Sequence, residues 1–197
     1  MTRKINTKKI SACAILGTLG FILMLLEFPV AFLIPSFIKL DFSEIPALIA
    51  AFAYGPFWGA LVCFVKNLLH LFITTTTGVG ELSNFILGVA FVGVAGVCYK
   101  RMHTKKGALI GALIGTAAMS IISVATNFFI VYPFYAKLFM PMEAILGAYK
   151  ALLPAVDNLL EALLIFNLPF NLLRGALVSI VCFLVYKRLS PLFKKMQ

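Results

Sequence analysis

Basic residues in this chain gather in three short clusters that contain no acid, and the stretches between the clusters are long and apolar. The clusters are Arg3/Lys4/Lys8/Lys9, Lys100/Arg101/Lys105/Lys106 and Lys187/Arg188/Lys194/Lys195, which hold twelve of the seventeen Lys and Arg residues. In multi-spanning membrane proteins the cytoplasmic loops carry an excess of Lys and Arg. The clusters therefore predict that both termini and a middle loop are cytoplasmic, with an even number of crossings between successive clusters.

The composition fits a membrane protein better than a soluble one. Hydrophobic residues make up 62% of the chain and charged residues only 12%, whereas a soluble domain is about half apolar. The net charge of +10 does not indicate nucleic-acid binding, because it lies at the ends of apolar stretches and not on one folded face. Anionic lipid headgroups are its expected partners. The length of 197 residues predicts a single transmembrane domain, 1–197, without a separate soluble domain.

Six apolar segments predict the helices of this domain. A helix needs about 20 residues to cross a bilayer, and the expected helices cover residues 10–26, 45–54, 57–75, 82–99, 107–136 and 169–186. The second is too short to cross alone, so protein must surround its ends. The predicted fold is all-α, a polytopic six-helix transmembrane bundle with both termini cytoplasmic. A further apolar stretch, 144–156, predicts a short helix lying over the outer mouth of the bundle.

Polar residues inside these segments indicate an interior site, because they are costly in lipid and face the protein. Lys66 lies about nine residues into its helix and should require an acid or several carbonyl groups as partners. His70 follows it by four residues and shares its helix face. Two interpretations stay open: a buried pair that holds helices together, or direct contact with a ligand.

Amides and a guanidinium are expected to meet near the outer face. Asn171 and Arg174 are three residues apart at the outer start of the last helix, and Asn127 lies in the outer half of the long fifth helix. Together they offer donors and acceptors, a mixture that suits a neutral, heteroaromatic, carbonyl-rich ligand better than a bare ion. Tyr135 belongs to a set of aromatic residues around them that suits a flat ligand. The alternative for any one of these aromatics is the interfacial belt of membrane proteins.

Two outer loops add further polar groups. The turn at 74–81, TTTTGVGE, has neither the Gly-Lys-Ser/Thr ending nor the preceding strand of a P-loop, so its hydroxyls, including that of Thr76, are expected to serve a polyol and not ATP. Asn84 follows in the next helix. The first outer loop, 28–44, is rich in proline and therefore stiff. We expect this loop to close over a bound ligand, with Asp41 near the polar end of the ligand.

No metal or catalytic site is predicted. The four cysteines, at 13, 63, 98 and 182, form no CxxC pair and suit small packing positions. Lys66 and His70 form the only titratable pair expected on one buried face, and they lack an obvious nucleophile.

The first helix carries a surface of small residues. Ala14 and Thr18 are four residues apart, and such small-xxx-small pairs permit the close approach of another helix. That other helix could belong to a partner protein that couples at the cytoplasmic side, or to this bundle itself.

Four segments carry a resemblance to a known family. They are LDFSEIPALI at 40–49, KNLLH at 66–70, TGVGELSNF at 77–85 and PFNLLRG at 169–175. With these segments the chain resembles the substrate-binding S components of energy-coupling factor (ECF) transporters, and in particular the riboflavin-specific members. The resemblance covers nearly the whole chain and implies a fold of six helices.

The resemblance implies a function, partners and site residues. An S component captures a vitamin at the outer face of the bacterial plasma membrane, associates with a membrane coupling protein and two cytoplasmic ATPases, and topples to expose its site inward. Here the substrate would be riboflavin, with FMN as a second candidate, no cofactor and no enzymatic activity. An S component for another vitamin and, more remotely, an intramembrane enzyme stay open as alternatives. The expected substrate-binding residues are Asp41, Thr76, Asn84, Asn127, Tyr135, Asn171 and Arg174, and the expected coupling surface is Ala14 and Thr18.

Overall fold

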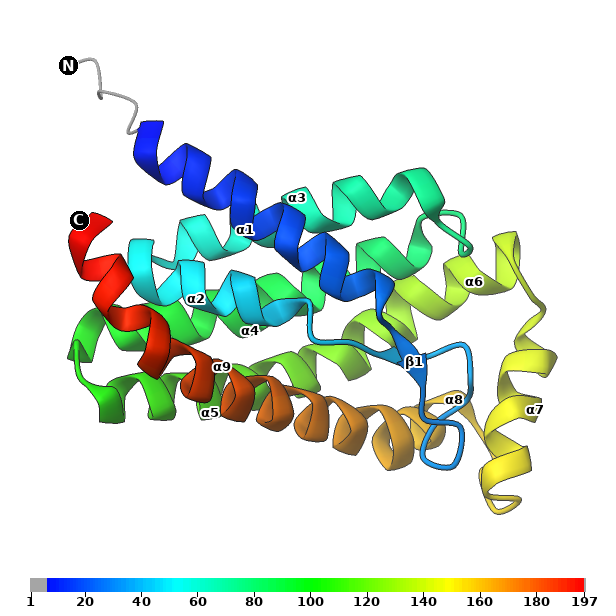
Figure 1. Ribbon diagram of the computed structural model, residues 1–197. Helices are drawn as coiled ribbons and strands as arrows, with labels where there is room; N and C mark the ends of the chain where they lie inside the picture. Colours follow the sequence, from blue (N-terminus) through cyan, green and yellow to red (C-terminus); the bar gives the residue numbers. More distant parts are fainter. Residues whose placement is uncertain (1–6, 197) are drawn as a thin grey trace.

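The chain forms a bundle of long helices (Figure 1). The structure is a computed structural model that describes the backbone of residues 7–196 and the side chains of residues 7–185. Arg3 and Lys4 of the first basic cluster lie outside the described residues, as do the side chains of the third cluster.

The helices follow the apolar segments of the sequence. The first part of the chain forms α1 (Thr7–Leu25), α2 (Glu44–Tyr54), α3 (Pro56–His70) with the 3₁₀ turn η1 (Leu71–Ile73), and α4 (Val79–Met102). The second part forms α5 (Lys105–Thr126), the π-helical turn η2 (Asn127–Val131), α6 (Tyr132–Leu138), α7 (Met142–Leu152), α8 (Leu159–Ala162), the π-helical turn η3 (Leu163–Asn167) and α9 (Leu168–Met196). The all-helical fold and the short helix within 144–156 are thereby confirmed.

Two short strands were not predicted. Strands β1 (Phe28–Pro29) and β2 (Lys39–Leu40) pair antiparallel and make a hairpin of the loop between α1 and α2. Each strand has only two residues, too few for an alternating pattern to be visible in the sequence.

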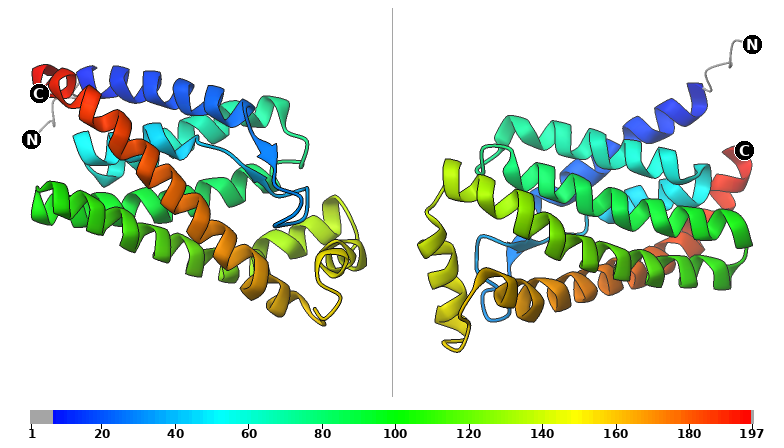
Figure 2. Two further views of the ribbon diagram at one scale, coloured as in Figure 1. Left: turned by 60° about the horizontal axis from the view of Figure 1, so that its bottom comes forward. Right: turned by 180° about the vertical axis from the view of Figure 1, so that it is seen from behind.

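The bundle has two different ends. The start of α1, the end of α9, the α2–α3 turn and the α4–α5 loop lie together at one end, here called the terminal end (Figures 1 and 2). The hairpin, α6, α7 and α8 lie at the other, here called the loop end, where α7 crosses the direction of the bundle (Figure 1). The exposed basic residues of the second cluster, Lys100, Arg101, Lys105 and Lys106, therefore mark the terminal end.

Five helical segments of the described chain are long and apolar enough to cross a membrane: Thr7–Leu25, Pro56–Ile73, Val79–Met102, Lys105–Leu138 and Leu159–Val185. The sixth apolar helix, α2, has 11 residues, of which nine are buried. Surrounding helices therefore enclose α2, as its short length predicts. At its end Gly55 has a φ of +106°, which favours glycine, and Pro56 starts α3 at the position where proline fits a helix.

Small residues allow the helices to approach closely. A Cβ at Gly111 would lie 2.7 Å from the carbonyl oxygen of Ala95, and one at Gly115 would lie 2.6 Å from that of Phe91. The backbones of α4 and α5 are therefore in near contact along this seam, as is common where helices pack in membranes.

Helix α1 divides its small residues between two faces. Cys13, Gly17 and Gly20 are buried, and a Cβ at Gly17 would lie 2.6 Å from Cγ1 of Val65 on α3. Ala14 and Thr18 are exposed, and the Thr18 hydroxyl donates to the carbonyl of Ala14 at 3.0 Å. The buried face serves packing within the bundle, whereas the Ala14/Thr18 face remains open in this chain.

Candidate functional site

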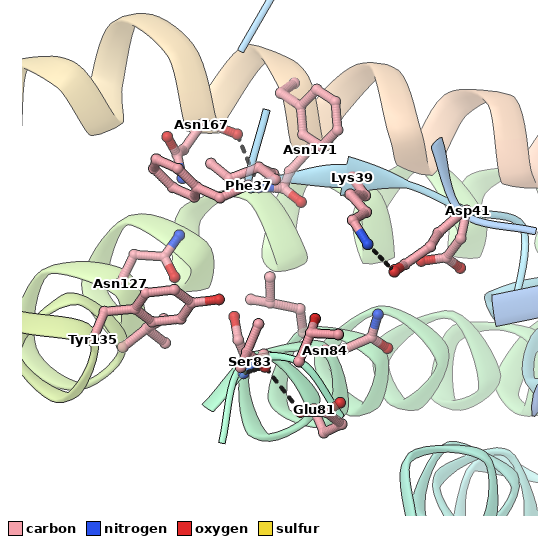
Figure 3. Close-up of a pocket in the computed structure, with 18 of the residues that line it drawn as sticks. Phe37, Lys39, Asp41, Glu81, Ser83, Asn84, Asn127, Tyr135, Asn167 and Asn171 are labelled. Carbon is pink, nitrogen blue, oxygen red and sulfur yellow. Dashed lines mark hydrogen bonds and ion pairs between the residues drawn. The ribbon is translucent and has the colours of Figure 1, made fainter. Parts of the chain in front are cut away.

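A cavity of about 280 Å³ lies at the loop end, between the hairpin loop, the ends of α1 and α3, and the segments α4, η2, α6, η3 and α9 (Figure 3). This is close to the size range of small-molecule sites, about 300–1,000 Å³. The structure brings all seven residues predicted to bind substrate to the wall of this one cavity: Asp41, Thr76, Asn84, Asn127, Tyr135, Asn171 and Arg174.

Two π-helical turns place amides on opposite sides of the cavity. Asn127 is the first residue of η2 and Asn167 is the last residue of η3. Each turn is followed two positions later by a proline, Pro133 or Pro169. Proline has no N–H and collides with the carbonyl four residues earlier, so the helix widens before it. Such π turns are frequent at functional sites.

Hydrogen bonds fix the orientation of two amide side chains in the cavity wall, those of Asn167 and Asn171. Asn171 donates from Nδ2 to the carbonyl of Asn167 at 2.9 Å, so its Oδ1 remains as an acceptor on the cavity side. The Asn167 amide is held by two tyrosines, because Tyr149 donates to Oδ1 at 2.5 Å and Nδ2 donates to the Tyr132 hydroxyl at 3.2 Å. Tyr149 is fully buried and belongs to α7, so the helix that crosses the loop end also orients a cavity residue.

Arg174 offers an unused donor. Its Nη2 donates to Oδ2 of Asp41 at 3.0 Å and lies 3.6 Å from Oε1 of Glu44. Its Nε is buried and has no hydrogen-bond partner, although a buried donor without a partner is costly. Arg174 lines the cavity, so a ligand there would meet its guanidinium, and the shielded Nε would have to turn toward the cavity to donate.

Asp41 is held ionised by its neighbours. Its Oδ1 accepts from the backbone N–H of Ser43 at 2.7 Å, and its Oδ2 accepts from Arg174. Burial raises the pKa of the Asp41 carboxyl, but the positive charges of Arg174 and Lys66 and the hydrogen bonds from Ser43 outweigh it, so the pKa lies below its ordinary value. The pair therefore presents a fixed negative and a fixed positive group to one wall of the cavity.

Lys66 has the acidic partner that its depth predicted. It is fully buried, and its ammonium donates to Oε1 of Glu44 at 2.8 Å, to Oδ1 of Asn84 at 2.8 Å and to the hydroxyl of Ser43. His70, on the same helix face, has a separate partner, because its Nδ1 lies 2.7 Å from Oε1 of Glu81. His70 lines the cavity, whereas Lys66 lies behind its wall.

The threonine turn forms a polar side of the cavity. The hydroxyls of Thr74 and Thr76 donate to Oε2 of Glu81 at 2.9 and 3.1 Å. The Thr76 hydroxyl also accepts from the backbone N–H of Gly80 at 3.1 Å, which stabilises the first turn of α4. Thr75, Thr76 and Glu81 line the cavity, so this side offers the hydroxyls expected of the turn and also the carboxylate of Glu81, which was not predicted.

The hairpin loop closes the cavity with groups that the sequence analysis missed. Lys39 pairs with Glu27 at the end of α1, and both line the cavity. Phe37 also lines it, with its ring centroid 6.3 Å from each of the rings of Tyr132, Tyr135 and Tyr149. The proline content of the loop indicated its stiffness, but only the pairing of β1 with β2 brings Phe37 and Lys39 over the site.

The donor set of the cavity suits an organic ligand. Among the residues whose positions the structure describes, no group of three or more His, Cys, Asp and Glu could hold a metal ion. The cavity wall combines amides, one guanidinium, hydroxyls and aromatic rings with carboxylates that are paired to Arg174, Lys39 or His70. A membrane-spanning bundle with such a cavity at one end defines a membrane-embedded binding protein for a small molecule.

Residues 8–186 match the family described as "ECF transporter, substrate-specific component", and the chain belongs to this family. It is therefore a multi-pass bacterial membrane protein and the substrate-specific (S) component of a transporter, not an enzyme. A solved structure described as "Structure and mechanism of the S component of a bacterial ECF transporter" is similar with a TM-score of 0.76 and 30% sequence identity, covering 96% of this chain and 99% of that one.

Curated relatives extend over nearly the whole chain. It is 32% identical to riboflavin transporter RibU of Staphylococcus aureus, over 98% of this chain and 97% of that protein. It is 33% identical to riboflavin transporter FmnP of Bacillus subtilis, over 94% of both chains. It is 31% identical to riboflavin transporter RibU of Streptococcus thermophilus, over 97% of this chain and 87% of that protein.

Proposed function

We propose that this S component binds riboflavin in the cavity at the loop end and delivers it across the membrane as part of an ATP-driven ECF transporter. The observation that carries the proposal is the chemistry of the cavity wall, where amides, Arg174, hydroxyls and aromatic rings surround one space. Riboflavin has a flat ring with carbonyl groups and an imide N–H, and a polyhydroxylated chain. The names of the curated relatives support the same substrate.

The two sides of the cavity match the two parts of riboflavin. The ring lies against Asn127, Asn171 and Arg174, where the guanidinium of Arg174 donates to a ring carbonyl and Oδ1 of Asn171 accepts from the imide N–H. The polyol chain lies toward Thr76 and Glu81, whose oxygens offer acceptors and donors for hydroxyl groups. Asp41, Asn84 and Tyr135 complete the contacts, and FMN is a second candidate ligand because Lys39 at the mouth could meet a phosphate.

The orientation in the membrane follows from the basic residues. Lys100, Arg101, Lys105 and Lys106 are exposed at the terminal end, and positive charge favours the cytoplasmic side. The termini are then cytoplasmic, the cavity opens to the outside, and α2 completes six helices in the bundle. Vitamin enters at the loop end.

The exposed Ala14/Thr18 face of α1 is the coupling surface of this proposal. It lies around the middle of α1, neither residue lines the cavity, and small residues there let a helix of the coupling protein approach closely. The coupling protein and its two cytoplasmic ATPases supply the energy, and toppling of the S component exposes the cavity inward.

A titration of ligand-free protein tests the substrate. The single tryptophan, Trp58, lies in the first turn of α3 and does not line the cavity, so quenching of flavin fluorescence is the better readout. We expect saturable binding of riboflavin that excess thiamine or pantothenate does not displace. Displacement by either, or no binding of riboflavin, would favour the second candidate function, an S component for another vitamin.

A further inference from the structure

Lys66 is the centre of a buried network behind the cavity wall. An ammonium has three N–H donors and no acceptor, and the three partners of Lys66 are oxygens of Ser43, Glu44 and Asn84. Its donors are therefore all used, and each partner must turn an oxygen toward Lys66. The side chain is fully buried and does not line the cavity, so a ligand in the cavity does not meet it directly.

The first partner, Asn84, lines the cavity from α4. Because Lys66 can only donate, the amide oxygen of Asn84 must face Lys66, at 2.8 Å. The amide nitrogen is then the end of Asn84 that remains for a ligand. Lys66 thereby makes Asn84 a donor toward the cavity.

The other two partners connect Lys66 to Asp41 and Arg174. Ser43 accepts from Lys66 through its hydroxyl and donates its backbone N–H to Oδ1 of Asp41 at 2.7 Å. Glu44 accepts from Lys66 at 2.8 Å, and the same oxygen lies 3.6 Å from Nη2 of Arg174. The negative charges of Asp41 and Glu44 thus balance the positive charges of Lys66 and Arg174 in one buried cluster. Of these four residues, Asp41 and Arg174 line the cavity.

The fold leaves space for this cluster. A Cβ at Gly88 on α4 would lie 2.8 and 2.9 Å from the two carboxylate oxygens of Glu44. A Cβ at Gly20 on α1 would lie 3.4 Å from Cβ and Cδ of Lys66. The glycines allow α4 and α1 to enclose the ion pair, so the positions of Glu44 and Lys66 are tightly defined.

We propose that Lys66 is a positioning residue for ligand binding: it fixes the donor end of Asn84 and the Asp41–Arg174 pair from behind the wall without touching the ligand. The proposal rests on the proposed function of the cavity. A merely structural role would make Lys66 important for folding alone, since the pair it forms with Glu44 joins α2 to α3.

A charge-neutral replacement separates the two roles. Lys66→Met alone removes the nearest positive charge from the buried Glu44, which keeps only the more distant Nη2 of Arg174 and the thiol of Cys63, both at 3.6 Å, and this variant should be poorly stable. Lys66→Met combined with Glu44→Gln removes both charges, and such exchanges of a buried ion pair are often neutral for stability. We expect the double variant to unfold, without ligand, near the wild-type temperature and yet to bind riboflavin about 10- to 100-fold more weakly, as expected when oriented donors are lost.

Coupling to Asn84 gives a readout that stability does not affect. In the wild type, Asn84→Ala should weaken binding about tenfold. In the double variant, Asn84→Ala should lower the affinity for riboflavin by less than about twofold, because the Asn84 amide is no longer oriented. The effects of substitutions within one network are not additive. Wild-type affinity in the stable double variant, or equal effects of Asn84→Ala in both backgrounds, would overturn the proposal.

Ser43→Ala keeps the test decisive if the double variant does not fold. It preserves all four charges and removes one acceptor of Lys66, and Ser43 does not line the cavity. We expect a several-fold loss of affinity, and unchanged affinity in a folded Ser43→Ala protein would overturn the proposal. If the wild type binds no riboflavin, the proposed substrate is wrong, whatever the role of Lys66. The affinities of the same variants are then measured with the vitamin that mass spectrometry identifies in the purified protein.

Discussion

Nη2 of Arg174 donates to Oδ2 of Asp41 at 3.0 Å, although the two residues are 133 positions apart in the sequence. Arg174 belongs to α9, and Asp41 lies between the hairpin and α2. The pair therefore ties the loop that closes the cavity to the helix that supplies the cavity amide Asn171. Both residues line the cavity, so this contact between the loop and α9 forms part of its wall.

Arg174→Ala should weaken riboflavin binding by one to two decades. The change removes the guanidinium from the cavity wall and leaves Asp41 without its main partner, and loss of a hydrogen bond to a charged group costs about 1.5–3 kcal/mol. Titration by quenching of flavin fluorescence measures the effect. Arg174→Lys is the control, since it keeps the charge without the planar fork, and it should bind with intermediate affinity. Unchanged affinity in Arg174→Ala would remove this residue from the site.

Asn171→Ala should weaken binding by about tenfold, because Oδ1 of Asn171 is the acceptor proposed for the imide N–H of the ring. Ser179→Ala serves as the matched control on the same helix. Ser179 is also buried, but it donates to the carbonyl of Gly175 and does not line the cavity. Equal affinities of the two variants would show that Asn171 makes no contact with the ligand.

Much of this site could be predicted from the sequence, because intramembrane polar residues must face the protein interior. That rule alone placed Asn127, Asn171 and Arg174 at one depth, and the cavity contains all three. A buried lysine requires an acid or several carbonyl groups nearby, and this requirement likewise predicted a partner for Lys66. The sequence could not say which acid, since Glu44 and Glu81 are both near in depth. Only the packing of α2 against α3 pairs Glu44 with Lys66, and only the packing of α4 against α3 pairs Glu81 with His70.

Other parts of the site depend on long-range contacts that no local pattern encodes. Phe37 meets three tyrosines from α6 and α7 because the two-residue strands close the hairpin. The π turns at Asn127 and Asn167 had a visible signal in Pro133 and Pro169 that was not used. The division of α1 into a buried and an exposed small face also required the structure, because Gly17 and Thr18 are adjacent in sequence and differ only in what packs against them.

Bound riboflavin should hold the hairpin loop closed. Ile34 is fully buried in this loop, whereas Ser36 is exposed. An impermeant thiol reagent should therefore modify a cysteine introduced by Ile34→Cys only when the loop opens, and riboflavin should slow that reaction. Ser36→Cys is the control and should react with or without the vitamin. Both belong in a Cys98→Ala background, since the other native cysteines are buried. If the Ile34→Cys variant were labelled at the same rate with and without riboflavin, the hairpin loop would not close over the ligand.

Bulk on the exposed face of α1 should block transport and spare binding. Ala14→Leu with Thr18→Leu should abolish riboflavin uptake by cells that depend on this protein, because the coupling helix can no longer approach. The purified double variant should keep wild-type affinity, since neither Ala14 nor Thr18 lines the cavity. Uptake at the wild-type rate would place the coupling surface elsewhere.

Two controls interpret the α1 experiment. Ala117→Leu with Ala125→Leu adds the same bulk to exposed positions of α5 and should leave uptake unchanged. Gly17→Leu adds bulk to the buried face, where Val65 leaves no room, and should prevent folding. Misfolding of the Ala14/Thr18 variant as well would mean that this face packs inside the bundle.

The Asp41–Arg174 pair should contribute a pH-dependent part of the stability. The pKa of Asp41 in the folded protein lies below its ordinary value, about 3.9 when unfolded. The contribution of the ionised Asp41 to the free energy of unfolding is therefore complete above the unfolded pKa and is lost as the pH falls through the lower folded pKa. Unfolding temperatures of ligand-free wild type and Asp41→Asn, measured from about pH 7 to about pH 3, should differ by a constant amount above about pH 5 and converge below about pH 4. A difference that stays the same down to the lowest pH would contradict this account.

The most direct test of the account is the visible absorbance of the protein purified from riboflavin-containing cells, with mass spectrometry of what it releases on denaturation. The wild type should be yellow and release riboflavin at about one molecule per chain, as one ligand in the cavity at the loop end predicts, while Arg174→Ala combined with Asn171→Ala should purify folded and colourless. A colourless wild-type protein that releases a different vitamin, or a variant that retains its flavin, would contradict the binding site described for this S component.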